Sequence, residues 1–265
     1  MQLFSDPISM GFLASLLAGG ATGLGAIPIF VRKDFSRRTL DLMLGFAGGV
    51  MLAASAFSLL VPAFDDAGVV ATGWVGVFSI VGMGFLLGAG FVHLADKYIP
   101  HEHFKRGHEG PSSRLARVWL LVTAITIHNL PEGLAVGVSF GGGHTAIGLS
   151  VAVAIGLQNI PEGLAVAAPL VREGYSRKYA AALALATGLV EPIGGLFGIS
   201  VVTFALTLLP YGLAFAAGAM IFVVGDEMVP ESHSGGNERL ATWGLILGFI
   251  VMMSLDNVFT FIFGG

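Results

Sequence analysis

Two copies of one short motif carry residue types that bind metal ions. HNLPEGLAV occupies residues 128–136, and QNIPEGLAV follows thirty positions later, at residues 158–166. Side chains four positions apart share a face of a helix. In the first copy this spacing places His128 beside Glu132, and Asn129 begins the neighbouring row. Each copy can therefore form two adjacent ion positions, with a glutamate bridging them.

The second copy repeats this arrangement with Gln158, Asn159 and Glu162. Imidazole, carboxylate and carboxamide ligands without a thiolate suit borderline divalent ions such as Zn²⁺, and Fe²⁺, Mn²⁺, Co²⁺ and Cd²⁺ accept them too. The alternative is that these side chains only hydrogen-bond within a helical bundle. Two copies of the motif favour a metal site over that alternative.

Each motif also contains a proline, which has no backbone N–H. Pro131 and Pro161 are expected to free the carbonyl groups four positions earlier and to kink their helices. At membrane depth such carbonyls are tolerated where they line a polar cavity, and there they coordinate cations. A third glutamate, Glu191 in LVEPIGG, also stands beside a proline and joins the candidate ligands.

The motifs lie in an unusually apolar chain. Of its 265 residues 55% are hydrophobic and 11% are charged, and the mean hydropathy is +0.84. This composition predicts an integral membrane protein. The net charge of −4, without a basic face, argues against a nucleic-acid partner, and the lack of cysteine excludes disulfides and thiolate metal sites.

Apolar stretches long enough to cross the hydrocarbon core occur eight times. Such a crossing takes about 20 residues, and in lipid the stretch must be helical to satisfy its own backbone. We therefore predict an all-α integral membrane protein with one domain over residues 1–265. The expected helices cover residues 8–31, 39–63, 72–95, 117–140, 145–170, 179–206, 211–229 and 240–263.

Helices 4 and 5 are consecutive, so they run antiparallel and present the two motifs in opposite orientations near mid-membrane. Inverted repeats of this kind indicate a transporter site. All 13 Lys and Arg residues fall in alternate connections between the helices. Because basic residues mark the cytoplasmic side, the N- and C-termini are expected outside the cytoplasm, in the plasma (inner) membrane. The first helix has no basic residue before it and is expected to be retained.

Further polar residues are weaker candidates for accessory metal ligands. The loop near residues 97–116 is rich in histidine and is either a solvated connection or a weak cytoplasmic metal site. For the others the alternative is an ordinary helix end, surface charge or packing. The accessory candidates are His101, His103 and His108 in the loop, Asp226, Glu227, Glu231 and His233 near the end of helix 7, Asp65 in helix 2 and Asp256 in helix 8.

With HNLPEG in helix 4, QNIPEG in helix 5 and a His-containing loop after helix 3, the sequence is similar to the ZIP (Zrt-, Irt-like) divalent metal transporters. MLGFAGGVMLAASAFSLLVP and AAGAMIFVVGDEMVPESH resemble the bacterial GufA-like branch of that family. The likeness covers nearly the whole chain. It implies an inverted-repeat 3+2+3 arrangement of the eight helices and an elevator-like motion of helices 1, 4, 5 and 6 against the rest.

The resemblance also implies a two-metal centre at mid-membrane. The primary site would consist of His128, Glu132, Gln158 and Glu162 with Met51 nearby; the second would consist of Asn129, Asn159 and Glu191, sharing both motif glutamates. This chain has Gln158 where many members of the family have histidine.

We therefore expect a transporter that moves Zn²⁺, or another divalent ion, toward the cytoplasm, with the metal as substrate and without an organic cofactor. An intramembrane metal-dependent enzyme is one alternative, but the chain lacks an HExxH motif and suitably spaced Ser/His or Asp/His pairs. A passive metal channel is the other. The expected partners are metal ions and membrane lipid, and a homodimer is a candidate assembly.

Overall fold

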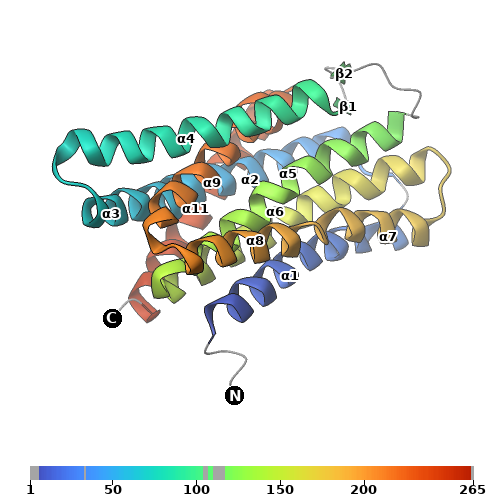
Figure 1. Ribbon diagram of the computed structural model, residues 1–265. Coiled ribbons are helices and arrows are strands. Elements are labelled where there is room, and N and C mark those ends of the chain that lie inside the picture. Colours follow the sequence, from blue (N-terminus) through green and yellow to red (C-terminus); the bar gives the residue numbers. More distant parts are fainter. Residues whose placement is uncertain (1–5, 33, 104–106, 110–116, 264–265) are drawn as a thin grey trace.

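The computed structural model describes residues 6–32, 34–103, 107–109 and 117–263, which form a bundle of long helices with one short hairpin (Figure 1). Within this described part, seven segments are long and apolar enough to cross a membrane: Pro7–Phe30, Arg37–Val70, Gly73–Tyr98, Thr145–Arg172, Arg177–Phe204, Leu206–His233 and Glu238–Ile262. The eighth expected segment is α5 (Arg117–Ser139), a helix of 23 residues. The prediction of an all-α membrane protein is confirmed.

Several of these segments consist of more than one element. In chain order the helices are α1 (Pro7–Gly25), η2 (Ile27–Phe30), α2 (Arg37–Ala53), η3 (Ala54–Leu60), α3 (Val61–Val70), α4 (Gly73–Tyr98), α5, η4 (Gly141–Gly143), α6 (Thr145–Arg172), α7 (Arg177–Gly188), α8 (Glu191–Phe204), η5 (Leu206–Leu208), α9 (Leu209–Val223), η6 (Val224–Met228), α10 (Val229–His233) and α11 (Glu238–Phe263). Between α4 and α5, β1 (His101–His103) pairs antiparallel with β2 (Gly107–Glu109), and Glu102 stands opposite His108.

The helices pack into two groups. In the motif group, α1 packs on α6, α7 and α8, and α5 packs on α8. In the flanking group, α2 packs on α11 and α4 packs on α9. The groups meet chiefly where α6 contacts α2 and where α5 contacts α9. The two helices that carry the repeated motif therefore stand at the boundary between the groups.

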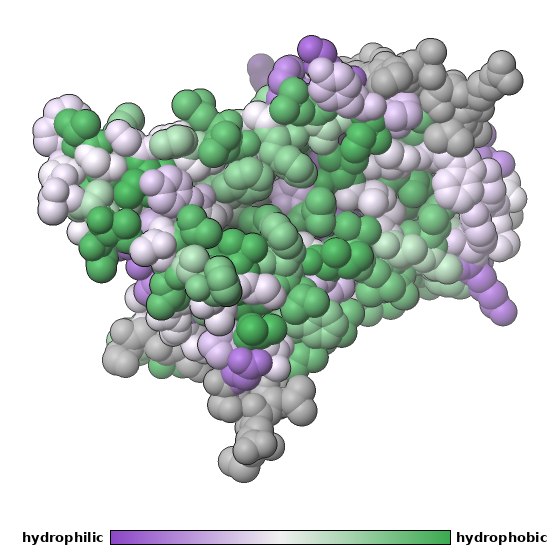
Figure 2. Space-filling view, viewed as in Figure 1, coloured by the Kyte–Doolittle hydropathy of each residue, from purple (hydrophilic) through white to green (hydrophobic). Residues whose placement is uncertain are grey.

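The outer faces of the flanking group are apolar. The span of α6 is the most buried of the seven and that of α11 the least, while α4 exposes Trp74, Phe78 and Leu86. Figure 2 shows apolar side chains over most of one flank, with hydrophilic residues collected toward the end that carries the hairpin. We call this end the hairpin end and the opposite one the termini end (Figure 1). An apolar belt between polar ends fits a lipid environment.

Glycines of the motifs let backbones touch. A Cβ at Gly133 would collide with the backbone of Glu191, and a Cβ at Gly163 would collide with the carbonyl group of Thr22. The Gly of each PEG triplet thus allows α5 to lie directly on the start of α8 and α6 to lie directly on α1. This contact is what brings Glu191, distant in sequence from residues 128–136, to the motif.

The sixth membrane segment is interrupted beside this contact. The sequence predicts one helix over residues 179–206, whereas the structure ends α7 at Gly188 and starts α8 at Glu191. Pro192 follows directly and cannot donate to a continuous ladder of hydrogen bonds. Glu191 consequently stands in the first turn of α8, where the helix dipole favours a negative charge.

Two long segments of the flanking group contain a π-helical turn. These turns are η3 and η6, and each ends directly before a Val–Pro pair, Val61–Pro62 and Val229–Pro230. A proline removes one donor from the regular ladder, and single π-turns occur frequently at functional sites. Here η3 carries the buried Ser58 and η6 carries the buried Glu227.

Candidate metal centre

The polar residues of both motifs meet inside the bundle, next to the interruption between α7 and α8. All of them are buried, although most are charged or carry amide groups. Glu132 is 1% exposed and Glu162 is 5% exposed. The fully buried members are Asn129, Gln158, Asn159 and Glu191. The structure therefore brings together the residues that sequence spacing and the family resemblance select from α5, α6 and α8.

Hydrogen bonds join these residues in pairs across helices. The Gln158 amide donates from Nε2 to Oε1 of Glu132 over 2.7 Å. The Asn159 amide donates from Nδ2 to Oε1 of Glu191 over 2.6 Å, and also to the Ala18 carbonyl over 2.7 Å. The second motif thus holds one carboxylate of α5 and one of α8 in fixed positions.

The remaining ligand atoms have no hydrogen-bond partner within the described part of the chain. Each unpaired buried group costs roughly 1–3 kcal/mol, so such a set demands an explanation. A bound cation would satisfy the oxygens, which make up most of the set, and none of these atoms is a cationic nitrogen. They are Oε2 of Glu132, Oε1 of Gln158, Oδ1 of Asn159, Oε2 of Glu191 and both amide atoms of Asn129.

Negative charge accumulates at this centre. The carboxylate of Glu132 interacts electrostatically with those of Glu162 and Glu191, and Glu162 also interacts with His128. Burying carboxylates near one another is costly unless opposite charge offsets them. Every Lys and Arg lies in an alternate connection between the predicted helices rather than in a motif. A divalent cation is the charge that the donor set fits.

His128 points to a second cluster. Its Nε2 lies 2.5 Å from Oε1 of Glu227 in η6, and Asp96 at the end of α4 completes a group whose ligand atoms all lie within 4.8 Å of one another. All three residues are buried, being 7% exposed or less. One imidazole and two carboxylates match the ligand preferences of Zn²⁺. Because α4 and η6 belong to the flanking group, the cluster spans the boundary between the groups.

Sequence reasoning missed Asp96. It stands beside Lys97 at the end of an apolar stretch, which is the pattern of a solvated helix end. Its burial against His128 depends on the packing of α4 next to α5 and α9, and no local pattern reports that packing. An acidic residue within the last helical turns before a His-rich loop was the only available signal.

Met51 and the two motif prolines lie in regular helical segments. Met51 is fully buried in α2 and belongs to the hydrophobic core that also contains Ala154 and Ile155 of α6. α5 and α6 continue through Pro131 and Pro161 as uninterrupted helices. The break in helical continuity next to the centre lies instead between α7 and α8.

Two of the accessory candidates near the end of the seventh predicted helix have other partners. Glu231 binds Arg37, and the ring nitrogens of His233 contact the Val229 carbonyl and the Thr242 hydroxyl. Asp65 is exposed on α3. Asp226 precedes Glu227 in η6. Among these candidates, Glu227 contacts a motif residue, His128.

The remaining candidates lie at the two ends of the molecule. Asp256 accepts hydrogen bonds from Ser58 over 2.6 Å and from Ser150 over 3.0 Å. The backbone of His101 and His103 lies in β1 and that of His108 in β2. The side chains of these three histidines lie outside the described part of the structure, so the prediction of a loop metal site is unchanged.

Comparison with known proteins gives one consistent result. The family model described as "ZIP Zinc transporter" matches residues 101–256, more than half of the chain. The chain is 47% identical to "Zinc transporter GufA" of Myxococcus xanthus over 249 residues, which cover 93% of this chain and 97% of that protein. It is also 47% identical to "Zinc transporter ZIPB" of Bordetella bronchiseptica over 252 residues (89% and 77%), and 38% identical to human "Zinc transporter ZIP11" over 333 residues (94% and 97%).

Proposed function

Because the chain belongs to the ZIP zinc transporter family, we propose that it carries divalent metal ions, with Zn²⁺ as the main substrate, across the membrane toward the cytoplasm. The relatives are named as transporters rather than enzymes. One observation carries the proposal: buried carboxylate and amide oxygens from α5, α6 and α8 converge at the centre of the bundle, and several have no protein partner. Such atoms can accept an ion from water and give it up again.

The centre has room in its ligand set for two ions. The first would take His128, Glu132, Gln158 and Glu162, with Met51 as an added soft ligand, and the second Asn129, Asn159 and Glu191 together with the shared glutamates. The hydrogen bonds from Gln158 to Glu132 and from Asn159 to Glu191 support this division, because each joins two ligands of one proposed ion. Fe²⁺, Mn²⁺, Co²⁺ and Cd²⁺ are further candidate substrates on the same ligand chemistry.

We propose that Asp96, His128 and Glu227 receive the ion as it leaves the centre toward the cytoplasm. The positive-inside rule assigns the hairpin end to the cytoplasm and both termini to the outside. On this orientation the cluster lies on the cytoplasmic side of the centre, since Asp96 stands near the end of α4 that leads into the hairpin. His128 is a ligand in both places and would pass the ion between them.

We propose further that the motif group slides against the flanking group in an elevator-like cycle. Support comes from the packing, which is most extensive inside each group. Polar contacts between the groups would have to break in each cycle. Toward the termini end, Ser150 of α6 donates to Asp256 of α11, and His144 lies 3.3 Å from Asp66 of α3. These contacts would close the outer side in the conformation described.

Uptake of radioactive Zn²⁺ into proteoliposomes tests the function. The purified chain should give saturable uptake that unlabelled divalent metals inhibit according to their fit to the site. A protein that catalyses no Zn²⁺ uptake in either orientation would overturn the proposal. Uptake that rises linearly with concentration would favour the passive channel instead of a carrier.

The proposed orientation has a separate test. Gly143→Cys and Ser113→Cys place a single thiol in loops predicted on opposite sides of the plasma membrane, in a chain without other cysteines. An impermeant thiol reagent should label only the first variant in intact cells. Labelling of Ser113→Cys under those conditions would reverse the topology while leaving the transport proposal in place.

A further inference from the structure

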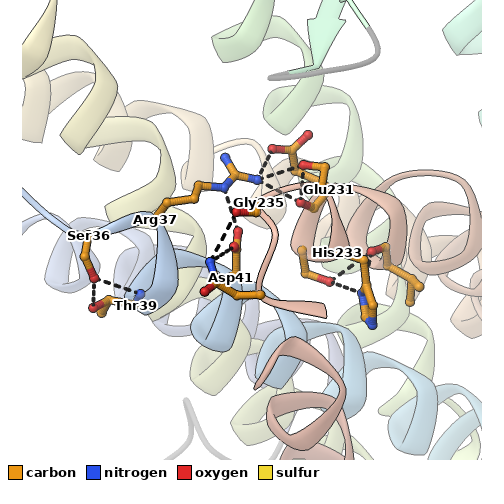
Figure 3. Close-up of polar contacts among 11 residues, drawn as sticks. Ser36, Arg37, Thr39, Asp41, Glu231, His233 and Gly235 are labelled. Atoms are coloured by element: carbon orange, nitrogen blue, oxygen red, sulfur yellow. Dashed lines mark hydrogen bonds and ion pairs between the residues drawn. The ribbon is translucent and has the colours of Figure 1, made fainter. Parts of the chain in front are cut away.

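A polar clamp connects the start of α2 with the end of the segment that contains η6 (Figure 3). Arg37 donates from Nη2 to the Glu231 carbonyl over 2.8 Å, to the Glu231 carboxylate over 2.7 Å and to the Ser234 hydroxyl over 3.0 Å. Its Nε lies 2.6 Å from the carboxylate of Asp41, one turn further along α2. One guanidinium thus holds α10 and the following turn against α2.

Asp41 holds Arg37 in place and also contacts the segment before α11. It is fully buried and accepts a hydrogen bond from the Asn237 amide over 2.9 Å, just before α11 begins. Gly235 lies so close that a Cβ there would collide with the Asp41 carboxylate. A buried carboxylate with a charged partner and an amide donor fixes geometry tightly, because its ligands are expensive to leave unpaired.

The clamp sits directly beyond the π-turn that carries Glu227. α9 is fixed before the turn by its packing on α4, and α10 is fixed after it by Arg37. A π-turn holds one residue more than a regular helical turn, and this residue can be lost from the turn only if the chain on one side shifts by one position. With both sides held, the extra residue stays in η6 and Glu227 keeps facing His128.

We propose that Arg37 is a positioning residue for metal release: it preserves η6 and thereby the ligand geometry of Asp96, His128 and Glu227. This inference rests on the proposed transport function, and it assigns Arg37 no contact with the ion. Without the clamp, η6 can relax toward a regular helix, which rotates Glu227 by about 100° away from His128. The ion would then leave the centre without its next ligand, so turnover slows while binding at the centre persists.

The test compares Arg37→Ala and Arg37→Lys with the wild-type protein in proteoliposomes, using Zn²⁺ alone as the probe. Arg37→Ala should lower the maximal uptake rate per folded molecule about tenfold, as expected for loss of a charged multi-donor contact. The half-saturating Zn²⁺ concentration should stay unchanged. Arg37→Lys keeps the charge but loses the planar guanidinium group. Its maximal uptake rate should lie between those of Arg37→Ala and the wild-type protein. Arg38→Lys, the exposed next residue, is the matched control.

Amide hydrogen exchange on the same purified proteins reads the geometry directly. Exchange over residues 224–233 should rise in Arg37→Ala and stay unchanged over residues 145–172 of α6. If Arg37→Ala does not fold, Arg37→Lys and Glu231→Gln provide the measurement. Both should lower the maximal uptake rate and raise amide exchange over residues 224–233, by less than is expected of Arg37→Ala.

Three results would overturn the inference while wild-type uptake stays intact. They are an unchanged rate per folded molecule, a raised half-saturating concentration at an unchanged maximal rate, and unaltered exchange over residues 224–233. Absence of wild-type Zn²⁺ uptake, by contrast, would reject the transport proposal itself.

Discussion

The two copies of the motif share most of their residues and have different surroundings. In the α6 copy, Gln158 and Asn159 both donate to carboxylates of the motif group. In the α5 copy, the equivalent His128 turns to Glu227 of the flanking group, and neither amide atom of Asn129 has a hydrogen-bond partner among the described residues. The α6 copy therefore fixes two carboxylates of the centre, while His128 of the α5 copy faces the boundary between the two groups.

The copies differ at two positions, 128/158 and 130/160, and the polar one, His128 against Gln158, makes this difference. An amide at 158 can hold a carboxylate in place by donating a hydrogen bond, and it remains a weak metal ligand. Imidazole is a common Zn²⁺ ligand, and at position 128 it also contacts a carboxylate of the flanking group. A histidine thus suits the residue that must exchange a carboxylate partner for a metal ion. The predictions below are arranged to break or sharpen this contrast.

The largest expected effect is the loss of a carboxylate that both ions would share. Glu162→Gln keeps the shape of the side chain and removes the charge that offsets a buried cation. Since removing one partner of a buried charge pair costs about 3–5 kcal/mol, Zn²⁺ uptake should fall by about a hundredfold or more, to background. Uptake should be normalised to the folded protein in the membrane. Wild-type uptake by this variant would mean that Glu162 is not a ligand of either proposed ion.

A covalent bond across the boundary should stop turnover almost as completely. An added Cβ at Gly212 of α9 lies 3.0 Å from a methyl carbon of Val138 on α5, so cysteines at both positions are close enough to form a disulfide. Oxidised Gly212→Cys/Val138→Cys protein should lose uptake and regain it on reduction.

The control places the same bond inside the motif group. A Cβ at Gly23 of α1 would lie 3.2 Å from that of Leu185 on α7, and both helices should move together. Gly23→Cys/Leu185→Cys should transport normally whether oxidised or reduced. Full flux through the oxidised Gly212–Val138 pair would instead support a channel that needs no sliding.

The sequence predicts some parts of the candidate site and not others. The ligands of the centre follow from helical spacing and repetition, because i and i+4 positions meet on any helix. The contact of Glu191 with the motif depends on Gly133, which permits the backbones to approach. The resemblance implied a site shared with Glu191, and helical spacing alone did not. Asp96 and the interruption before Glu191 were not predicted, since burial of a helix end and the loss of a helical turn at a proline both depend on neighbouring helices.

Swapping the side chains at positions 128 and 158 should have unequal effects, so that His128→Gln and Gln158→His differ in what they change. His128→Gln removes the ligand shared by the centre and the Asp96–Glu227 pair, and should lower the maximal uptake rate about tenfold, as for the loss of a charge-assisted contact. Gln158→His adds a stronger ligand to the centre alone. It should lower the half-saturating Zn²⁺ concentration while changing the maximal rate little. Equal losses from the two exchanges would mean that the copies do not divide their tasks as proposed.

The smallest effect is expected at the hairpin, outside the two motifs. β1 and β2 are only three residues each, and they follow α4, which carries Asp96 in its last turn, on the side where the ion would leave under the proposed orientation. On the proposed path, His101, His103 and His108 would meet an ion only after the Asp96–His128–Glu227 cluster has released it. Replacing all three by alanine should keep uptake within about twofold of wild type, the scale of a weak surface contact. Complete loss of uptake by a folded triple variant would place these histidines in the pathway, and the ion would then need a third ligand set beyond the two that the motif copies supply.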